Sequence, residues 1–296
     1  MSIVTILLPD FALILLGALL FRFTRWGESF WTGLEKLVYF VLFPALLFYS
    51  TTRTQLDFAA AGKMLQVALG ALFLSVAIAW LAKPLFRPGP MLFESGVQAA
   101  FRFNSYIALA IAFRLGGDRG TSLMALLMGF AIPLCNVFAV HALIHRGGGL
   151  FKELSRNPLL LSTAGGLLFN YVGLQLPEVV AITLSRIGNA SIAIGLLLVG
   201  AGLRMTGLHQ AKAMAAYFLL VKLVIYPAIA LLLAQLVGLS GLQLQIAVIF
   251  AALPTASSAY VLATRMGGNG PYVAFLLTAA TMLSAVTLPF WLLATQ

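Results

Sequence analysis

Charged residues are scarce in this sequence, at 9% of its 296 residues, whereas 61% are hydrophobic. A soluble globular domain carries about a quarter charged residues. So few charges cannot coat the surface of a soluble fold, and a soluble enzyme is excluded. The apolar residues gather in long runs that match the ~20 residues needed to span a ~30 Å hydrocarbon core. The sequence therefore predicts an all-α integral membrane protein.

Cysteine is also scarce, since Cys135 stands alone in the chain. A single cysteine excludes a disulfide framework. The sequence has no series of ~10-residue segments that alternate apolar and polar residues, as a transmembrane barrel would. It has no Walker motif either, so primary pumping by this chain is excluded. The first apolar run lacks a small-x-small cleavage site and is expected to be a span, not a signal peptide.

Apolar stretches between Gly, Pro and charged residues predict ten transmembrane helices. Their expected ranges are 3–22, 36–53, 62–85, 95–115, 121–145, 157–174, 185–204, 212–237, 242–265 and 270–294. The more polar stretches 28–36 and 178–186 are expected to form interfacial helices. No soluble domain is inserted anywhere between these segments.

The distribution of Lys and Arg predicts the orientation, because both are enriched in cytoplasmic loops. With the N-terminus outside, eleven of the eighteen lie on the inner side and five on the outer side. We therefore expect both termini outside, in a bacterial cytoplasmic (inner) membrane. The net charge of +10 needs no nucleic-acid partner, because basic inner loops facing the anionic lipid bilayer account for most of it.

A shift of 151 residues aligns the chain weakly with itself. It places Arg114-Leu115-Gly116-Gly117-Asp118 on Arg265-Met266-Gly267-Gly268-Asn269. A division into a first repeat, 1–145, and a second repeat, 152–296, gives each half five spans. An odd number of spans forces the halves into opposite orientations, which is the inverted repeat typical of secondary transporters.

In such transporters the substrate site lies near the midplane, where broken helices expose backbone groups. Span nine carries Pro254-Thr255-Ala256-Ser257-Ser258, in which the proline removes a donor and the hydroxyls can cap a restarting helix. The shift places Phe103-Asn104-Ser105-Tyr106 of span four at the same position. This coincidence favours paired breaks over an ordinary proline kink. The candidate substrate-binding residues near the breaks are Asn104, Ser105, Pro254, Thr255, Ser257 and Ser258, with Asn136 of span five beside Pro133.

Three charged residues lie inside predicted spans, where charge is costly and usually functional. Lys222 lies ~15 Å along span eight, so we expect it to line the cavity or to pair within the bundle. Arg102 either joins the site beside Asn104 or snorkels to the inner interface. Asp10 is shallower, and is either a wetted interfacial carboxylate or the site of a coupling ion.

Both deep charges, Arg102 and Lys222, are positive, and the N-termini of half-helices would add positive potential. The sequence therefore predicts a small organic anion, a carboxylate, as the substrate. Asp10 is the only acid within a span. A proton or sodium ion as coupling ion stays open.

Several short motifs resemble the auxin efflux carrier family, which includes plant PIN carriers and bacterial malate and malonate permeases. They are Arg102-Phe103-Asn104-Ser105, Pro133-Leu134-Cys135-Asn136-Val137, Asn157-Pro158, Lys222 with Pro227, and Ala251-Ala252-Leu253-Pro254. The resemblance covers essentially the whole chain and implies ten helices as two inverted five-helix repeats. It implies that spans four and nine cross at their breaks, with Asn104 and the Pro254 break in contact with substrate. Plant carriers have a proline at the first break, and its absence here predicts a gentler break.

The resemblance also implies a mechanism. Spans 3–5 and 8–10 would form a transport domain that moves against a scaffold of spans 1, 2, 6 and 7, in elevator-like alternating access. The family includes auxin, malate and malonate carriers, and the resemblance does not choose among them.

Other functions fit less well or stay open. A sodium-coupled symporter of the bile-acid type and a passive anion channel fit the same scaffold. An enzyme is not expected, because His141 and His145 have neither an H-E-x-x-H pattern nor a nearby carboxylate. We expect no catalytic residue, metal or cofactor. The small residues Gly195, Gly200 and Ala201-Gly202 allow close helix packing, either within the chain or in a homodimer.

Overall fold

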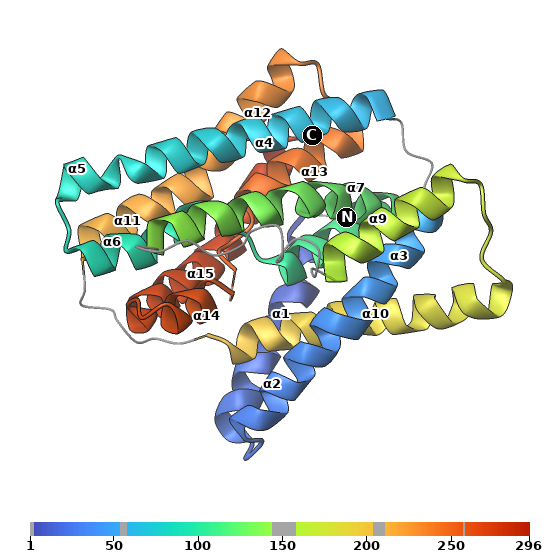
Figure 1. Ribbon diagram of the computed structural model, residues 1–296, viewed down its shortest axis with the longest axis horizontal. Helices are drawn as coiled ribbons and strands as arrows, with labels where there is room; N and C mark the ends of the chain where they lie inside the picture. Colours follow the sequence, from blue (N-terminus) through green and yellow to red (C-terminus); the bar gives the residue numbers. More distant parts are fainter. Residues whose placement is uncertain (1–2, 54–57, 144–157, 204–210, 257) are drawn as a thin grey trace. The chain divides into compact units, whose positions relative to one another are not determined.

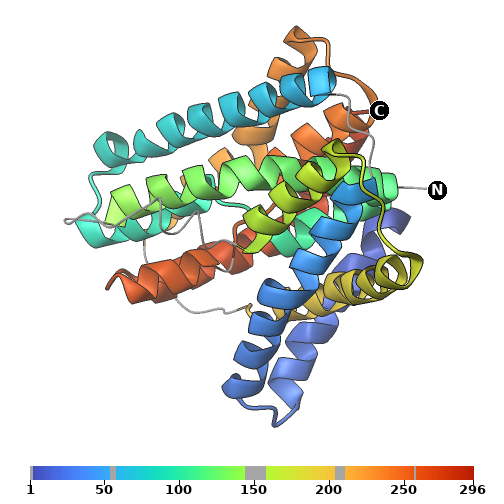
Figure 2. The same cartoon turned by 45° about the vertical axis from the view of Figure 1, so that its right-hand side comes forward.

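The computed structural model describes residues 3–53, 58–143, 158–203, 211–256 and 258–296, and within these ranges every regular element is a helix (Figures 1 and 2). The elements are α1 (Ile3–Phe23), α2 (Glu28–Leu37), η1 (Val38–Leu42), α3 (Phe43–Arg53), α4 (Phe58–Trp80), α5 (Ala82–Phe86), α6 (Pro90–Gly96), η2 (Val97–Ala100), α7 (Ser105–Leu143), α9 (Pro158–Tyr171), α10 (Glu178–Ala201), α11 (Lys212–Leu220), η3 (Val221–Ile225), α12 (Tyr226–Leu236), α13 (Gly241–Ala252), α14 (Ser258–Arg265) and α15 (Gly270–Ala294).

Six helical segments in the described residues are long and apolar enough to cross a membrane. They are Glu28–Thr52, Ala61–Phe86, Pro90–Leu143, Glu178–Ala201, Lys212–Leu236 and Gly270–Ala294. The expectation of an all-helical membrane protein is therefore confirmed. Every one of the ten expected spans overlaps a helix, and Pro90–Leu143 covers two of them. That all ten cross the membrane, as two inverted repeats, stays a prediction.

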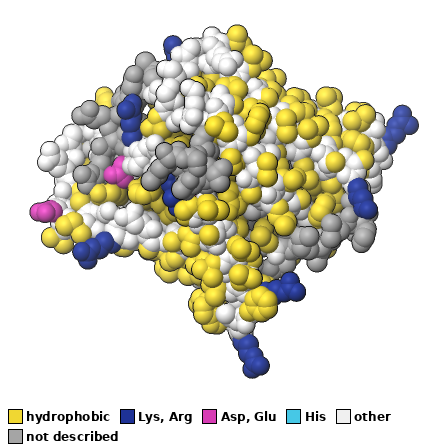
Figure 3. Space-filling view, turned by 180° about the vertical axis from the view of Figure 1, so that it is seen from behind, with side chains coloured by type: hydrophobic (Ala, Val, Ile, Leu, Met, Phe, Trp, Pro, Cys, Tyr) yellow, Lys and Arg dark blue, Asp and Glu magenta, His cyan; other side chains and the backbone are white. Residues whose placement is uncertain are grey.

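The surface agrees with a membrane environment. Hydrophobic side chains cover most of the face seen in Figure 3, and Lys and Arg lie mainly at its margins. Large apolar side chains such as Phe23, Val179 and Val286 are about three-quarters exposed, at 75%, 76% and 74%. In lipid such exposure needs no partner, because hydrocarbon tails are as apolar as these side chains.

Both stretches expected to form interfacial helices are helical, but each is continuous with an apolar helical segment; their position at the membrane interface stays a prediction. Residues 28–36 lie in α2, which continues through the π-helical turn η1 into α3, and residues 178–186 are the first turns of α10. The residue that follows α2, Val38, has helical φ and ψ of −61° and −48°. The residue directly after each stretch is neither proline nor glycine. Helical hydrogen bonding therefore continues into the apolar segment.

The described chain forms two compact units. Unit 1 comprises residues 1–58, 106–129 and 150–202, and unit 2 comprises residues 59–105, 130–149 and 203–296. In α7 the φ and ψ angles of Gly116 and Gly117 are not helical, and Gly117 has a φ of +54°. The element is therefore two helices joined at a turn, and this turn belongs to unit 1.

Close packing in unit 1 depends on glycine. A Cβ at Gly17 of α1 would overlap the backbone of Leu197 in α10, and one at Gly200 would overlap the carbonyl of Ile14. Gly195 lies against the ring of Tyr106. Gly195 and Gly200, two of the small residues that the sequence singled out in span seven, thus pack within the chain, as small residues do between membrane helices.

Unit 2 is built around α15, which packs against α6, α11, α13 and α14. Its interior includes the fully buried rings of Tyr226, Tyr272, Phe101, Phe218 and Phe250. Trp291 of α15 donates its indole N–H to the carbonyl of Leu223 at 2.8 Å. This carbonyl lies in η3, where a π-helical turn frees backbone groups from the regular ladder.

Candidate functional site

Two helices are interrupted in their middle, and the described residues of both interruptions, 101–104 and 253–256, belong to unit 2. The first runs through α6 and η2, stops after Ala100 and resumes at Ser105 as α7. The second ends with α13 at Ala252 and resumes at Ser258 as α14. The sequence predicted both interruptions, at 103–106 and 254–258. Broken helices of this kind expose free backbone groups in secondary transporters.

The two breaks have different causes. Leu253 has φ −57° and ψ 141°, the extended conformation that a following proline imposes, so Pro254 accounts for the second break. The first contains no proline, and Phe101 leaves the helix with φ −133° and ψ −22°. It still interrupts the helix over four residues, 101–104. That this break is gentler than the proline-containing break of plant carriers stays a prediction.

Each break supplies hydrogen-bond partners for the other. The backbone N–H of Asn104 donates to the carbonyl of Pro254 at 2.8 Å, and the hydroxyl of Thr255 donates to the carbonyl of Ala99 at 2.8 Å. Asn104 and Thr255 are both buried, at 1% and 0% exposure. Buried backbone groups need such partners, so the two interrupted segments hold each other in non-helical conformation.

Arg102 points into this region and does not snorkel to an interface. Its guanidinium donates to the side-chain oxygens of Gln98 at 3.3 Å, Asn136 at 3.0 Å and Ser258 at 3.0 Å. Only 8% of Arg102 is exposed. Three residues that the sequence selected, Arg102, Asn136 and Ser258, are thereby brought together, and the oxygens around the cation are neutral amides and a hydroxyl.

Lys222 reaches the second break by a different route. Its ammonium donates to the carbonyl of Ala251 at 2.9 Å and lies 4.4 Å from the centre of the Tyr226 ring. Its side chain is fully buried. Ala251 lies in the last turn of α13, where the unsatisfied carbonyls of a helix attract positive charge. Lys222 therefore pairs within the bundle, one of the two roles that the sequence allowed.

The remaining candidates take several positions. Ser105 is the first residue of α7 and is half-buried. Ser257 lies outside the described residues. Asp10 lies in unit 1, where it is bonded to Arg114. His141 is exposed, and the described residues hold no group of three His, Cys, Asp or Glu side chains that could bind a metal.

Sequence reasoning missed some partners. Gln98 holds Arg102 from four residues earlier, and this i, i+4 spacing is a signal that could have found it. The rings of Phe103 and Phe250 lie 4.5 Å apart beside the breaks. The carbonyls of Ala99 and Ala251 leave no signal in a sequence, because a carbonyl is present at every residue.

Unit 2 is strongly biased in charge. Its only acid is Glu94, and its cations are Lys63, Lys83, Arg87, Arg102, Arg146, Arg204, Lys212, Lys222 and Arg265. Two of these cations, Arg102 and Lys222, are buried next to the breaks. The electrostatic field of such a site favours an anion.

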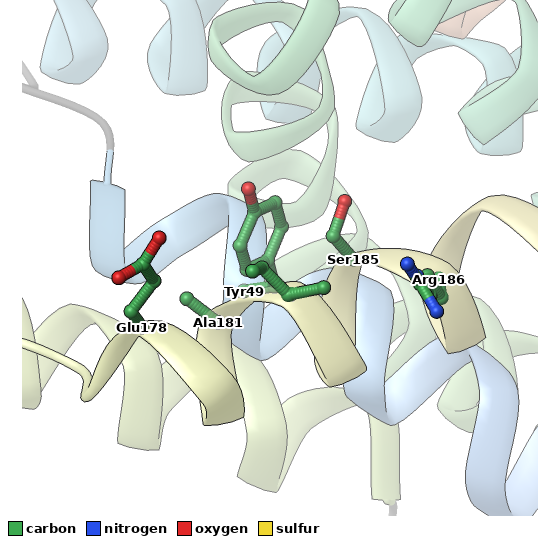
Figure 4. A pocket seen from close by; sticks show the side chains of 6 residues that line it. Tyr49, Glu178, Ala181, Ser185 and Arg186 are labelled. Atoms are coloured by element: carbon green, nitrogen blue, oxygen red, sulfur yellow. The ribbon is translucent and has the colours of Figure 1, made fainter.

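A surface pocket lies elsewhere, in unit 1. Its volume is about 390 Å³, and it is lined by Tyr49, Glu178, Ala181, Ile182, Ser185 and Arg186. Figure 4 shows Glu178 and Arg186 at opposite ends of the row of side chains, with Tyr49 and Ser185 between them. None of the residues selected from the sequence lines this pocket. We place the candidate site at the breaks, where the buried cations and broken helices coincide.

Comparison with known proteins agrees with a transporter. A family model described as "Membrane transport protein" matches residues 147–292. A protein of Rhizobium meliloti (strain 1021) named "Putative malonate transporter" is 23% identical over 300 residues, which cover 97% of this chain and 93% of the relative. An "Uncharacterized transporter" of Methanothermobacter thermautotrophicus is 25% identical over 293 residues, 94% of each chain.

Proposed function

We propose that this chain, which belongs to the membrane transport protein family, is a secondary transporter that carries a small carboxylate across the bacterial inner membrane. The observation that carries the proposal is the pair of breaks joined from Asn104 to Pro254 at 2.8 Å, with the buried guanidinium of Arg102 beside them. Broken helices at the midplane bind substrates in many secondary transporters.

The chemistry of the site favours a carboxylate. A guanidinium binds a carboxylate through two parallel N–H···O bonds, which are about twice as strong as bonds between neutral groups. An incoming carboxylate would take over donors that Arg102 now directs to Asn136 and Ser258. Neutral donors such as Asn104, Ser105 and Thr255 would complete its coordination, with the backbone freed at Pro254 nearby. Because the Rhizobium meliloti relative is named as a malonate transporter, malonate is the first dicarboxylate to test.

An elevator-like movement of unit 2 against unit 1 would provide alternating access. Unit 1 holds expected spans 1, 2, 6 and 7, and unit 2 holds expected spans 3, 8, 9 and 10, which supports a division into scaffold and transport parts. Spans four and five are shared, because residues 106–129 group with unit 1.

Contacts at span ends support the ten-span topology. Asp10 at the start of span one bonds to Arg114 at the end of span four, and Asn170 of span six bonds to the carbonyls of Thr51 and Thr52 at the end of span two. The topology requires all of these ends to lie on one side of the membrane. Lys and Arg are more numerous on the opposite side of the membrane, which indicates that the opposite side is cytoplasmic. These span ends and both termini would then lie outside.

Uptake of labelled malonate, malate and an auxin-like acid into proteoliposomes tests the proposal, with and without proton and sodium gradients. A saturable uptake of one anion, lost in Asn104→Ala, supports a carrier. Asn189→Ala is the matched control, because Asn189 is exposed on α10 of unit 1. A current that does not saturate indicates an anion channel, and a strict sodium requirement indicates a sodium-coupled symporter. Absence of transport for every anion would overturn the proposal.

A further inference from the structure

One carboxylate of unit 1 is buried in a predicted span. Asp10 of α1 is 3% exposed, and it is the only Asp or Glu that is buried among the residues that the structure describes. A charged group in this position is costly, and such groups mark ion or proton pathways in membrane proteins.

Arg114 is the cation that faces Asp10. Its Nε donates to Oδ2 of Asp10 at 2.7 Å, and 33% of its side chain remains exposed. Oδ1 of Asp10 is buried and accepts no hydrogen bond from any residue that the structure describes. The carboxylate is thus only half satisfied, although buried polar oxygens normally find a donor.

The other charged residues of α10 and of the first part of α7 are exposed or bonded to other residues. α10 packs on α1 through Gly200, which lies against the carbonyl of Ile14, and its own charged residues Glu178 and Arg186 are exposed. On α7, Asp118 accepts a bond from Ser50 at 3.4 Å, and Arg119 is exposed.

The position of Arg114 suits a contact that opens and closes. It lies two residues before Gly116, where α7 turns between its two helices. The end of unit 1 that holds this turn is also the end that the distribution of Lys and Arg assigns to the outside. Because the side chain of Arg114 is partly exposed there, it can leave Asp10 for water without creating a second buried charge.

A proton fits this site better than a metal ion does. Sodium or a divalent cation would need several oxygen ligands, and no second Asp or Glu is buried among the residues that the structure describes. A proton needs one oxygen lone pair and leaves a neutral carboxylic acid, which is cheaper to bury than the ion. Proton binding also removes the charge that holds Arg114.

We propose that Asp10 is the proton-binding site of this transporter. A proton entering from the outer side binds the carboxylate, and the bond to Arg114 opens. When the ion pair forms again in the inward-facing state, the carboxyl group releases the proton to the inner side. This inference rests on the proposed transport function and adds its coupling ion.

The test follows malonate uptake together with proton influx, reported by a pH dye inside proteoliposomes. An inward proton gradient should accelerate uptake by wild type at least about tenfold, a typical size for coupling between two sites. Asp10→Asn should lose this acceleration and the proton influx, yet keep exchange of external for internal malonate. Asp10→Glu should retain proton influx. Glu178→Gln, which removes an exposed carboxylate of the same unit, should behave as wild type. Proton influx at the wild-type ratio in Asp10→Asn would overturn the proposal.

Two further measurements test the proton site if Asp10→Asn does not fold or if wild type transports no dicarboxylate. If Asp10→Asn does not fold, the double variant Asp10→Asn/Arg114→Gln removes both charges of the pair and should show the same loss of proton influx. If wild type moves no dicarboxylate, the proposed function fails by itself. Protonation of Asp10 is then measured by infrared spectroscopy of the protein in lipid vesicles. The band of protonated carboxyl groups is followed between about pH 8 and pH 4. A band present in wild type and absent from Asp10→Asn supports the site, and identical spectra contradict it.

Discussion

The backbone N–H of Asn104 donates to the carbonyl of Pro254 at 2.8 Å, across 150 residues of sequence. This bond joins the two breaks within one residue of the positions that the internal repeat predicts to be equivalent, since the repeat places Asn104 on Thr255. Interruption of the helix at both places frees backbone groups that need other partners, and the opposite break supplies one of them. The two breaks therefore stabilise each other. We expect substitutions of their side chains to affect transport more than substitutions elsewhere.

Asn104→Ala should reduce anion uptake at least about tenfold, while the protein stays folded. The backbone bond to Pro254 does not need the side chain, so the break should persist, whereas the amide proposed to bind substrate is lost. Loss of one hydrogen bond to a charged ligand corresponds to about 1.5–3 kcal/mol, which is roughly ten- to a hundredfold. Uptake in proteoliposomes and thermal unfolding measure the two effects. Wild-type uptake in a folded Asn104→Ala protein would remove this residue from the site.

Arg102→Lys should lose most transport even though it keeps the positive charge. Arg102 bonds to oxygens on Gln98, Asn136 and Ser258 at once, and the compact ammonium of lysine cannot reproduce the planar fork of a guanidinium. Arg25→Lys, at an exposed position, is the control for expression and insertion. Equal uptake by Arg102→Lys and wild type would show that charge alone matters at this position.

Lys222→Met should destabilise the protein as well as impair transport. The substitution keeps an unbranched side chain but leaves the buried carbonyl of Ala251 without the ammonium that donates to it at 2.9 Å. An unsatisfied buried acceptor costs about 1–3 kcal/mol, so the unfolding temperature should fall. Lys222→Ala should fall further because it also leaves a cavity. Lys212→Met, at an exposed position, should change neither property. An unchanged unfolding temperature in Lys222→Met would contradict this role.

Gly200→Ala should destabilise unit 1, because the added Cβ overlaps the carbonyl of Ile14 on α1. Overpacking of this kind costs typically about 1–3 kcal/mol. Gly33→Ala is the matched control, since nothing lies within 4 Å of its added Cβ and alanine favours a helix interior by about 1 kcal/mol. Thermal unfolding in detergent compares the two variants. A stable Gly200→Ala protein would mean that α1 and α10 can separate at little cost.

The breaks could be predicted from sequence because their causes are local. Pro254 cannot continue a helix, and the repeat carries this information to Asn104, where no proline is present. The direction of Arg102 could not be predicted, because the choice between the site and the interface depends on Asn136 and Ser258, which lie 34 and 156 residues away. Only tertiary structure brings such distant residues together.

Two other features show where sequence patterns fail. The partner of Lys222 is the backbone carbonyl of Ala251, and no side chain marks it in the sequence. Asp10 and Arg114 each lie near the end of a predicted span, so each by itself fits an ordinary interfacial charge. The polar character of residues 28–36 predicted a separate helix, but helix ends need a residue that stops hydrogen bonding, and none is present there.

The most direct test of the central claim is the concentration dependence of labelled malonate uptake into proteoliposomes, measured for wild type and for Asn104→Ala in parallel. A carrier site at the crossing of the two breaks predicts saturable uptake by wild type and loss of that uptake in the folded variant, with Asn189→Ala unchanged. Uptake that rises linearly with concentration, or that persists fully in Asn104→Ala, would contradict a carrier site at this crossing.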